Sequence, residues 1–324
     1  MVCAFARVSL CTLLGLTLTA LCLAQDYPSK PVRVVLPIPG GSVTDVTLRA
    51  AAQELAPRFG QPLVIDNRPG ANMIVAAEAC AKGVPDGYTV CVVSPDAMSF
   101  NPNVFEKLSY DVDRDFRPVG SLFVLIEGLI ATSSLPANST RELQSLAVAK
   151  PGSINFGTLG PGTTPDIFRQ WLAGTWKTDI VGIPYKGGNL VINALLAGEI
   201  HVSKIGVGNL GGQISSGKVK ILAIGATKRS NQLPNVPTMA EAGLDGFKFR
   251  VWWGLVAPAG TPDPIVARLN SEFNRLFSEP KFGEFMESRF LEPMIGTPQA
   301  FAAFLKQDRE YVGQIVKQYN IPRQ

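Results

Sequence analysis

The sequence predicts an α/β protein of two Rossmann-like lobes with mostly parallel sheets and two crossings between the lobes. Short β-branched segments alternate with helical patterns along the chain, an order typical of parallel sheets covered by helices. Glycine-rich loops separate strand from helix at three places. Two long apolar segments, residues 119–131 and 252–257, have the character of buried strands that cross from one lobe to the other.

The N-terminal segment, residues 1–24, is expected to be a cleavable signal peptide and not part of the fold. Arg7 is followed by a nearly continuous apolar run from Val8 to Leu23, and small residues precede the polar pair Gln25-Asp26. A lipoprotein with Cys22 as the lipidated residue is the weaker alternative, because a large leucine precedes it. No later stretch is apolar enough to span a bilayer. We therefore expect an exported chain, periplasmic in a Gram-negative cell.

The charge balance argues against nucleic acid as a partner. The formal net charge is +4, and about +3 once the signal segment is removed. Basic residues are scattered and are not interleaved with aromatic residues. The remaining chain of roughly 300 residues is long enough for one large or two medium domains.

Two cysteines, Cys80 and Cys91, lie outside the signal segment. One falls on an expected helix and the other on the following strand. They can pair in an oxidising compartment, but pairing depends on the distance between them in the fold. The sequence therefore leaves this disulfide open.

The first strand–loop–helix unit contains the best candidate binding loop. A strand over residues 32–36 is followed by a Pro-Gly-Gly turn and a helix that ends at Gly60. Such a turn leaves backbone N–H groups exposed at a helix N-terminus, where the helix dipole favours an anion. We expect Asp45, in the first turn, to cap the helix or to accept from a ligand. An ordinary tight loop is the alternative. The candidate ligand residues of this loop are Pro39, Gly40, Gly41 and Ser42.

The rest of the first half continues the alternation. Strands are predicted over residues 63–66 and 89–93, with a helix over 72–82 between them. A polar loop over residues 94–102 follows the second of these strands, so Ser94 is a candidate wall residue of the site. Five nearby acids are expected in turns or on the surface; they are Asp86, Asp96, Asp111, Asp113 and Asp115.

The second half repeats the strand–loop–helix unit twice. After a helix over 140–150, the first copy has a strand at 154–158, a loop at 159–164 and a helix at 165–173, with Thr164 suited to the N-cap and Pro165 to the first turn. The other elements are the strand 180–184, the loop 185–188, the helix 189–197, the strands 200–207 and 219–226, and C-terminal helices over 264–277, 281–288 and 298–318.

The loops of both halves are expected to face one cleft, because ligands bind outside the C-terminal ends of parallel strands. A lysine in the cleft would meet a ligand carboxylate directly, so Lys204 is a candidate, with a solvent-exposed position at a strand end as the alternative. The candidate ligand residues from the second half are Thr158, Gly160, Gly162, Thr163, Thr164, Tyr185 and Lys204.

Residues for catalysis or metal binding are scarce. His201 is the single histidine, and no nucleophile elbow lies near it. No Cys/His spacing fits a metal, and the glycines at 157, 160 and 162 lack the dinucleotide-binding spacing. We expect no cofactor, no metal ion and no catalytic residue. The pair Trp252-Trp253 is expected to pack between the lobes, with ligand stacking as the alternative.

Seven motifs occur in order over the chain that follows the signal segment. They are Pro39-Gly-Gly-Ser-Val-Thr-Asp45, Asn67-Arg-Pro-Gly70, Pro85-Asp-Gly-Tyr-Thr89, Asp115-Phe-Arg-Pro-Val119, Pro184-Tyr-Lys-Gly-Gly188, Leu233-Pro-Asn-Val-Pro-Thr238 with Glu241-Ala-Gly243, and Trp253-Gly-Leu-Val-Ala-Pro-Ala-Gly-Thr-Pro262. Together they resemble the extracytoplasmic solute receptors of the tripartite tricarboxylate transporter family, the Bug or TctC-like proteins.

The resemblance implies a fold of the periplasmic-binding-protein type that closes on a small carboxylate: a di- or tricarboxylate, an acidic amino acid or an aromatic acid. With the two apolar crossings, it places residues 26–125 plus 249–324 in the first lobe and residues 126–248 in the second. The expected partners are this ligand and the subunits of a membrane permease, or a sensor, and the receptor is expected to be a monomer.

The chain departs from the family pattern at two places. Asp166 stands where the family often has histidine, and His201 and Lys204 stand where an acidic and an aromatic residue are usual. These differences leave the identity of the acid open. One alternative is an exported enzyme acting on a small organic acid on the same scaffold, with Asp45 and either Asp166 or Lys204 as its acid–base pair. An exported structural or adhesive protein is a third possibility.

Overall fold

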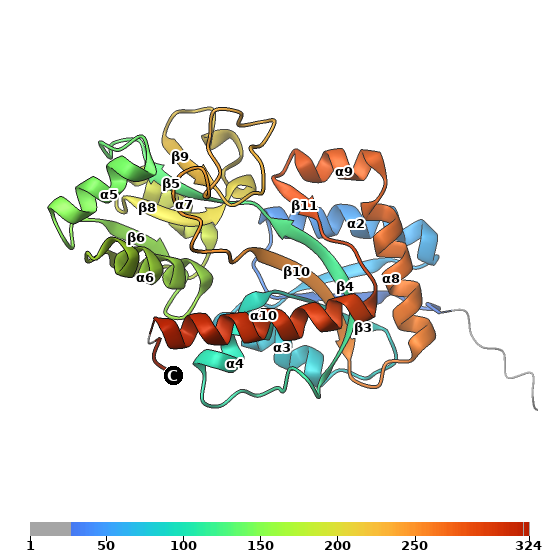
Figure 1. The fold of residues 1–324 in the computed structure, drawn as a ribbon. Coiled ribbons are helices and arrows are strands. Elements are labelled where there is room, and N and C mark those ends of the chain that lie inside the picture. The colour runs from blue at the N-terminus through green and yellow to red at the C-terminus, as the bar shows by residue number, and fades with distance from the viewer. Residues whose placement is uncertain (1–26, 320, 324) are drawn as a thin grey trace, which may run out of the picture.

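Two β-sheets, each flanked by helices, form two lobes that lie side by side (Figure 1). The computed structural model describes residues 27–319 and 321–323. The predicted signal peptide lies outside the described residues. None of the helices described is long and apolar enough to cross a membrane.

The first sheet has six strands in the order β11-β4-β10-β3-β1-β2. Strand β1 pairs in parallel with β2 and β3, whereas β10 runs antiparallel to β3 and β4, and β11 antiparallel to β4. Four of the six strands therefore point the same way. The strands are β1 (Val32–Leu36), β2 (Leu63–Asn67), β3 (Thr89–Val93), β4 (Phe116–Leu125), β10 (Val251–Pro258) and β11 (Leu291–Pro293).

Helices cover both faces of this sheet, because alternate residues of a strand point to opposite sides. Val34 packs in one cluster with Leu48 of α2 and Leu269 of α8. Val35 packs in another with Ala77 of α3 and Phe301 of α10. The helices of this lobe are α2 (Val43–Phe59), α3 (Ile74–Ala81), α4 (Asn101–Val104), α8 (Asp263–Phe277), α9 (Pro280–Glu287) and α10 (Pro298–Gln318).

The second sheet has five strands in the order β7-β6-β8-β5-β9. Strand β6 is parallel to β7 and β8, and β5 is antiparallel to β8 and β9, so β5 alone among these strands runs the opposite way. The strands are β5 (Glu127–Thr132), β6 (Asn155–Thr158), β7 (Val181–Pro184), β8 (Val202–Gly206) and β9 (Val219–Ile224). The helical segments are α5 (Thr140–Ala149), α6 (Thr164–Trp176), α7 (Gly188–Ala197) and η3 (Val207–Gln213). The predicted two-lobed α/β fold with mostly parallel strands is confirmed.

The chain passes between the sheets at two neighbouring points. Strand β4 ends in the first sheet at Leu125 and β5 begins in the second at Glu127, so the long apolar segment is two strands and not one. On the return, Val251 of β10 pairs with Leu125. Figure 1 shows both connections between the lobes, with α10 reaching toward the second lobe below α6. This arrangement supports lobe limits at 125/126 and 248/249, which we retain as a proposal.

Two local predictions were wrong. The predicted loop over 94–102 is helical instead, with η2 (Asp96–Phe100) leading into α4. Its apolar residues explain the difference, because Ala97, Met98 and Phe100 are buried and favour a compact turn structure. The predicted helix over 72–82 begins later, at Ile74, after three residues with positive φ.

Cys80 of α3 and Cys91 of β3 form a disulfide, with their Cα atoms 6.1 Å apart. The sequence had left this pairing open. Both cysteines belong to the same buried cluster on one face of the first sheet, so the bond ties a helix to the sheet beneath it.

Candidate ligand-binding site

The N-termini of α2 and α6 lie at the boundary between the lobes, and each is bound by a side chain from the opposite lobe. The backbone amide of Val43, the first residue of α2, donates to Oδ1 of Asn209 at 2.9 Å. The backbone amide and hydroxyl of Thr164, the first residue of α6, face Oδ1 of Asp96 at 3.4 and 3.3 Å. The two glycine loops that precede these helices therefore lie at the same interlobe boundary.

Asp45 organises the first loop. Its buried carboxylate accepts from the amide of Gly41 at 2.9 Å, from Nδ2 of Asn67 at 2.9 Å and from Nε of Arg49 at 3.0 Å. Burial alone would raise the pKa of Asp45, but hydrogen bonds from Arg49, Gly41 and Asn67 outweigh it and hold the pKa below its usual value. Ser42 is the N-cap, and its hydroxyl accepts from the amide of Asp45. Asp45 is therefore an anion that shapes the loop.

Asp166 organises the second loop in the same way. Its carboxylate accepts from the amide of Gly162 at 3.2 Å, from Arg169 at 2.9 Å and from Gln170 at 2.9 Å. In both loops a buried aspartate in the first helical turn binds the glycine amide four residues earlier. Thr163, and not Thr164 as the sequence predicted, occupies the N-cap.

Several of the predicted ligand donors are already bonded within the loops. The amides of Gly41 and Gly162 bind Asp45 and Asp166, the amide of Gly160 faces the hydroxyl of Thr158 at 3.3 Å, and the hydroxyl of Thr163 donates to the carbonyl of Gly160 at 2.6 Å. These bonds give each loop a defined shape. A side chain at Gly41 or Gly160 would meet no atom within 4 Å, so space remains beside both loops.

The remaining candidates take different positions. Pro39 and Gly40 are exposed at the tip of the first loop. Ser94 is fully buried, and its hydroxyl contacts Sδ of Met73 at 2.9 Å. Tyr185 is half-buried against the α7 side of the second lobe, outside the contacts that join the lobes.

Lys204 is neither solvent-exposed nor a free cation in the cleft. It comes from β8, is 3% exposed and forms an ion pair with Glu127 of β5. Its Nζ lies 5.5 and 5.9 Å from the ring centroids of Phe168 and Phe247. Burial lowers the pKa of Lys204 to about 7, and the charge of Asp96 opposes this shift. Lys204 is thus bonded to Glu127 in this structure, and its direct contact with a ligand carboxylate stays a prediction.

Asp96 is the site residue that the sequence missed. It was expected in a turn or on the surface, but it is 9% exposed and lies between the lobes. Burial raises the pKa of its carboxyl group, and hydrogen bonds from Thr164 and Ser94 oppose the shift. Its position shortly after a buried strand, from which Ser94 and Pro95 separate it, was the one local signal available.

The acid–base pairs considered for an enzyme are held in ion pairs. Asp45 binds Arg49, Asp166 binds Arg169 and Lys204 binds Glu127. Nδ1 of His201 accepts from the amide of Asn155 at 2.9 Å, which links the start of β6 to the residue before β8. In residues 27–319 and 321–323, no three His, Cys, Asp or Glu side chains are grouped to hold a metal ion. Trp252 packs on Phe301 and Phe304, within the first lobe.

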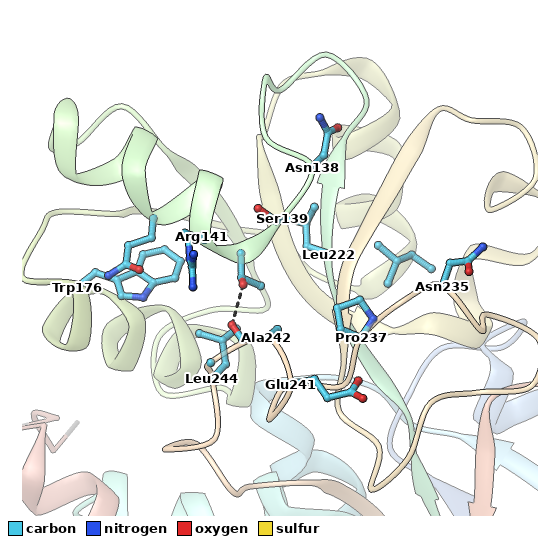
Figure 2. A pocket seen from close by; sticks show the side chains of 14 residues that line it. Asn138, Ser139, Arg141, Trp176, Leu222, Asn235, Pro237, Glu241, Ala242 and Leu244 are labelled. Atoms are coloured by element: carbon cyan, nitrogen blue, oxygen red, sulfur yellow. Dashed lines mark hydrogen bonds between the residues drawn. The ribbon is translucent and has the colours of Figure 1, made fainter.

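A separate groove of about 680 Å³ lies on the second lobe (Figure 2). It is bordered by the start of α5, the end of α6, strand β9 and residues 235–244, and includes Arg141, Trp176 and Glu241. Two of its lining residues are joined by a hydrogen bond, in which the hydroxyl of Thr140 donates to the carbonyl of Ala242 at 2.8 Å. Neither glycine loop contributes to this groove, so we place the candidate site at the interlobe boundary.

Comparison with known proteins relates the chain to solute receptors. A family model described as "Tripartite tricarboxylate transporter family receptor" matches residues 47–321. The structure of Rpa4515 from R. palustris with adipate is 29% identical, with a TM-score of 0.88 over 92% of this chain and 100% of that chain. The periplasmic binding protein BugD is 30% identical, with a TM-score of 0.85 over 92% and 100%. MatC from Rhodopseudomonas palustris with bound malate is 30% identical, with a TM-score of 0.81 over 90% and 100%.

Proposed function

The chain belongs to the tripartite tricarboxylate transporter family of receptors, and we propose that it captures a small carboxylate between its two lobes in the periplasm. The observation that carries this proposal is that two helix N-termini, those of α2 and α6, both lie at the interlobe boundary, each against a side chain of the opposite lobe. Each is a site that favours an anion, and each already binds an oxygen atom from the opposite lobe.

The proposed ligand contacts divide into donors and the residues that position them. Asp45 and Asp166 position the loops by binding Gly41 and Gly162. The backbone beside Gly41 and Gly160, where an added side chain would meet no atom within 4 Å, is then open to a ligand. The full proposed set is Pro39, Gly40, Gly41, Ser42, Asp45, Ser94, Thr158, Gly160, Gly162, Thr163, Thr164, Tyr185 and Lys204.

The ligand class follows from the same geometry and from the relatives. A carboxylate presents two oxygen acceptors, which suit backbone donors of two facing loops. The relatives described above hold adipate and malate, both of them small dicarboxylates. We extend the carboxylate class, though not either compound, to this chain.

The remaining parts of the proposal concern export and partners. Residues 1–24 act as a cleavable signal peptide, and the mature receptor is a monomer of two lobes, residues 26–125 plus 249–324 and residues 126–248. Ligand binding stabilises the closed arrangement of the lobes, and permease subunits or a sensor recognise that arrangement.

A thermal-shift screen tests the receptor function. Mature protein is stripped of carry-over ligand by partial unfolding and refolding, then heated with mono-, di- and tricarboxylates, amino acids and aromatic acids. At about a hundred times its Kd, a ligand adds roughly 2.7 kcal/mol of stability, which raises the Tm by a few degrees.

Asp166→Asn weakens the response, because the amide of Gly162 and Arg169 lose their charged acceptor. Asp245→Asn is the matched control, since Asp245 is exposed in the second lobe. A flat response to every acid, together with no bound solute in the mass spectrum of the purified protein, would overturn the proposal.

A further inference from the structure

Buried acids in the described part of the chain have cationic partners, with one exception. Five carboxylic acids are buried among residues 27–319 and 321–323: Asp45, Asp96, Glu127, Asp166 and Glu272. Four of them form ion pairs: Asp45 with Arg49, Glu127 with Lys204, Asp166 with Arg169, and Glu272 with Arg268. Within the part of the chain that the structure describes, Asp96 is the buried acid for which no ion pair is found.

Hydrogen bonds do not make up for the missing cation. The contacts of Asp96 with the amide and hydroxyl of Thr164 measure 3.4 and 3.3 Å, and that with the hydroxyl of Ser94 measures 3.5 Å. Good bonds to an ionised carboxylate are shorter, about 2.5–2.9 Å. A carboxylate so removed from water requires a partner of opposite charge or a proton.

The nearest protein cation does not supply that partner. Lys204 is close enough for its charge to interact with that of Asp96, but its ammonium group is bonded to Glu127. Two acids therefore share one cation, and the cluster of Asp96, Glu127 and Lys204 has an excess of one negative charge. The aspartates of the two glycine loops are each balanced by their own arginine, so the excess lies at Asp96.

Asp96 lies where a ligand would meet it, at the N-terminus of α6 and between the lobes. We propose that Asp96 pairs with a positively charged amino group of the ligand, which makes the solute an amino acid or a related amino-carboxylate. This inference rests on the proposed receptor function and narrows its substrate class. The ligand's ammonium group neutralises Asp96, and its carboxylate lies at the glycine loops, where backbone donors and the helix N-termini receive it. A plain dicarboxylate adds negative charge beside an acid that is already unpaired.

Calorimetric titration of the stripped receptor with matched ligand pairs tests this inference. Each pair shares one carbon skeleton with and without the amino group: aspartate and succinate, glutamate and glutarate, phenylalanine and 3-phenylpropionate. We expect the amino member of at least one pair to bind about tenfold tighter or more, since a buried ion pair is lost with the amino group. In Asp96→Asn, an isosteric change that removes the charge, this preference disappears, while Asp245→Asn preserves it.

The outcomes separate the two proposals. Tighter binding of the deaminated acid by the unaltered receptor, or an undiminished preference for the amino member in Asp96→Asn, would overturn the role of Asp96 and leave the receptor function standing. Absence of binding by all six of these ligands and by every acid of the thermal-shift panel, with no solute in the mass spectrum, would overturn the receptor function as well. Melting curves of Asp96→Asn establish that the variant is folded. The mass spectrum of the solute released by unfolding the unaltered receptor tests the ligand class independently, because that solute either contains an amino group or does not.

Discussion

Oδ1 of Asn209, in the second lobe, accepts a hydrogen bond at 2.9 Å from the amide of Val43, the residue that begins α2 in the first lobe. The two residues are 166 positions apart in the sequence. In a second contact, the amide of Thr164, at the start of α6 in the second lobe, donates to Oδ1 of Asp96 in the first lobe. Each lobe thus supplies a cap for a helix of the other, which links closure of the lobes to satisfaction of both helix N-termini.

Asn209→Ala is expected to weaken closure. It removes the acceptor for the amide of Val43, and a net hydrogen bond is worth about 1 kcal/mol, so ligand affinity falls about fivefold. Calorimetry measures the affinity, and small-angle X-ray scattering measures the radius of gyration, which increases in the absence of ligand. Asn235→Ala, at an exposed position on the second lobe, is the control and leaves both unchanged. Unaltered affinity and radius in Asn209→Ala would show that this cap does not hold the lobes together.

Replacement of Lys204 is expected to destabilise the protein more than replacement of Glu127, its partner in the buried ion pair. Removing one partner of such a pair typically costs about 3–5 kcal/mol. Lys204→Met leaves Glu127 and Asp96 both without a cation and should show the full cost. Glu127→Gln costs less, because the charge of Asp96 lies close enough to act on Lys204 in its place. Urea unfolding of both variants measures the difference, and equal losses would contradict the proximity of Asp96.

Asp96→Asn is expected to stabilise the ligand-free protein in a pH-dependent way. Burial raises the pKa of Asp96 above its ordinary value of 3.8, so the folded state binds more protons than the unfolded state between that value and the raised pKa. The contribution of Asp96 to stability therefore falls as the pH rises through this window. The advantage of Asp96→Asn is smallest below pH 3.8 and grows toward neutral pH.

The measurement is the difference in unfolding free energy between the variant and the unaltered protein at a series of pH values. Taking the difference removes the contributions of groups that both proteins share, including Asp45, whose lowered pKa acts with the opposite sign. The titratable groups that interact with the charge of Asp96 are Lys204, Asp308 and Tyr110. All three are present in both proteins, as is Glu127, the ion-pair partner of Lys204. A difference that stays constant from pH 3.5 to 7 would contradict a raised pKa for Asp96.

Loss of the disulfide is expected to destabilise the first lobe. Cys80 and Cys91 are separated by 11 positions, and a cross-link of that span is worth about 3 kcal/mol through its effect on the unfolded chain. The double variant Cys80→Ala/Cys91→Ala should lose this amount in urea unfolding. Full reduction of the unaltered protein in urea gives the same midpoint as the variant if the disulfide is the cause. A midpoint unchanged by either treatment would show that the bond contributes no stability.

Local patterns were sufficient to predict the fold class and the two strand–glycine loop–helix units. The strand before Pro39, the glycine turn and the helix after it are all encoded within about thirty residues, and the same holds for the loop before Thr164. Asp45 was likewise predicted as a capping residue, and Asp166, for which the sequence had suggested other roles, acts in the same way on a glycine four positions away. Seven motifs in order were enough to identify the family.

The sequence by itself determined that two helices begin directly after glycine loops, with N-terminal amides that need acceptors, because caps, turns and helix dipoles depend on neighbouring residues. Only the tertiary structure decided which side chains meet those donors and which charges remain unbalanced. Asp96 reaches Thr164 across 68 positions and Glu127 reaches Lys204 across 77. Burial gives these charges their importance, since an acid in a turn is solvated while the same acid between two lobes requires a partner. Burial is a property of the packed lobes, and no local pattern around Asp96 specifies it.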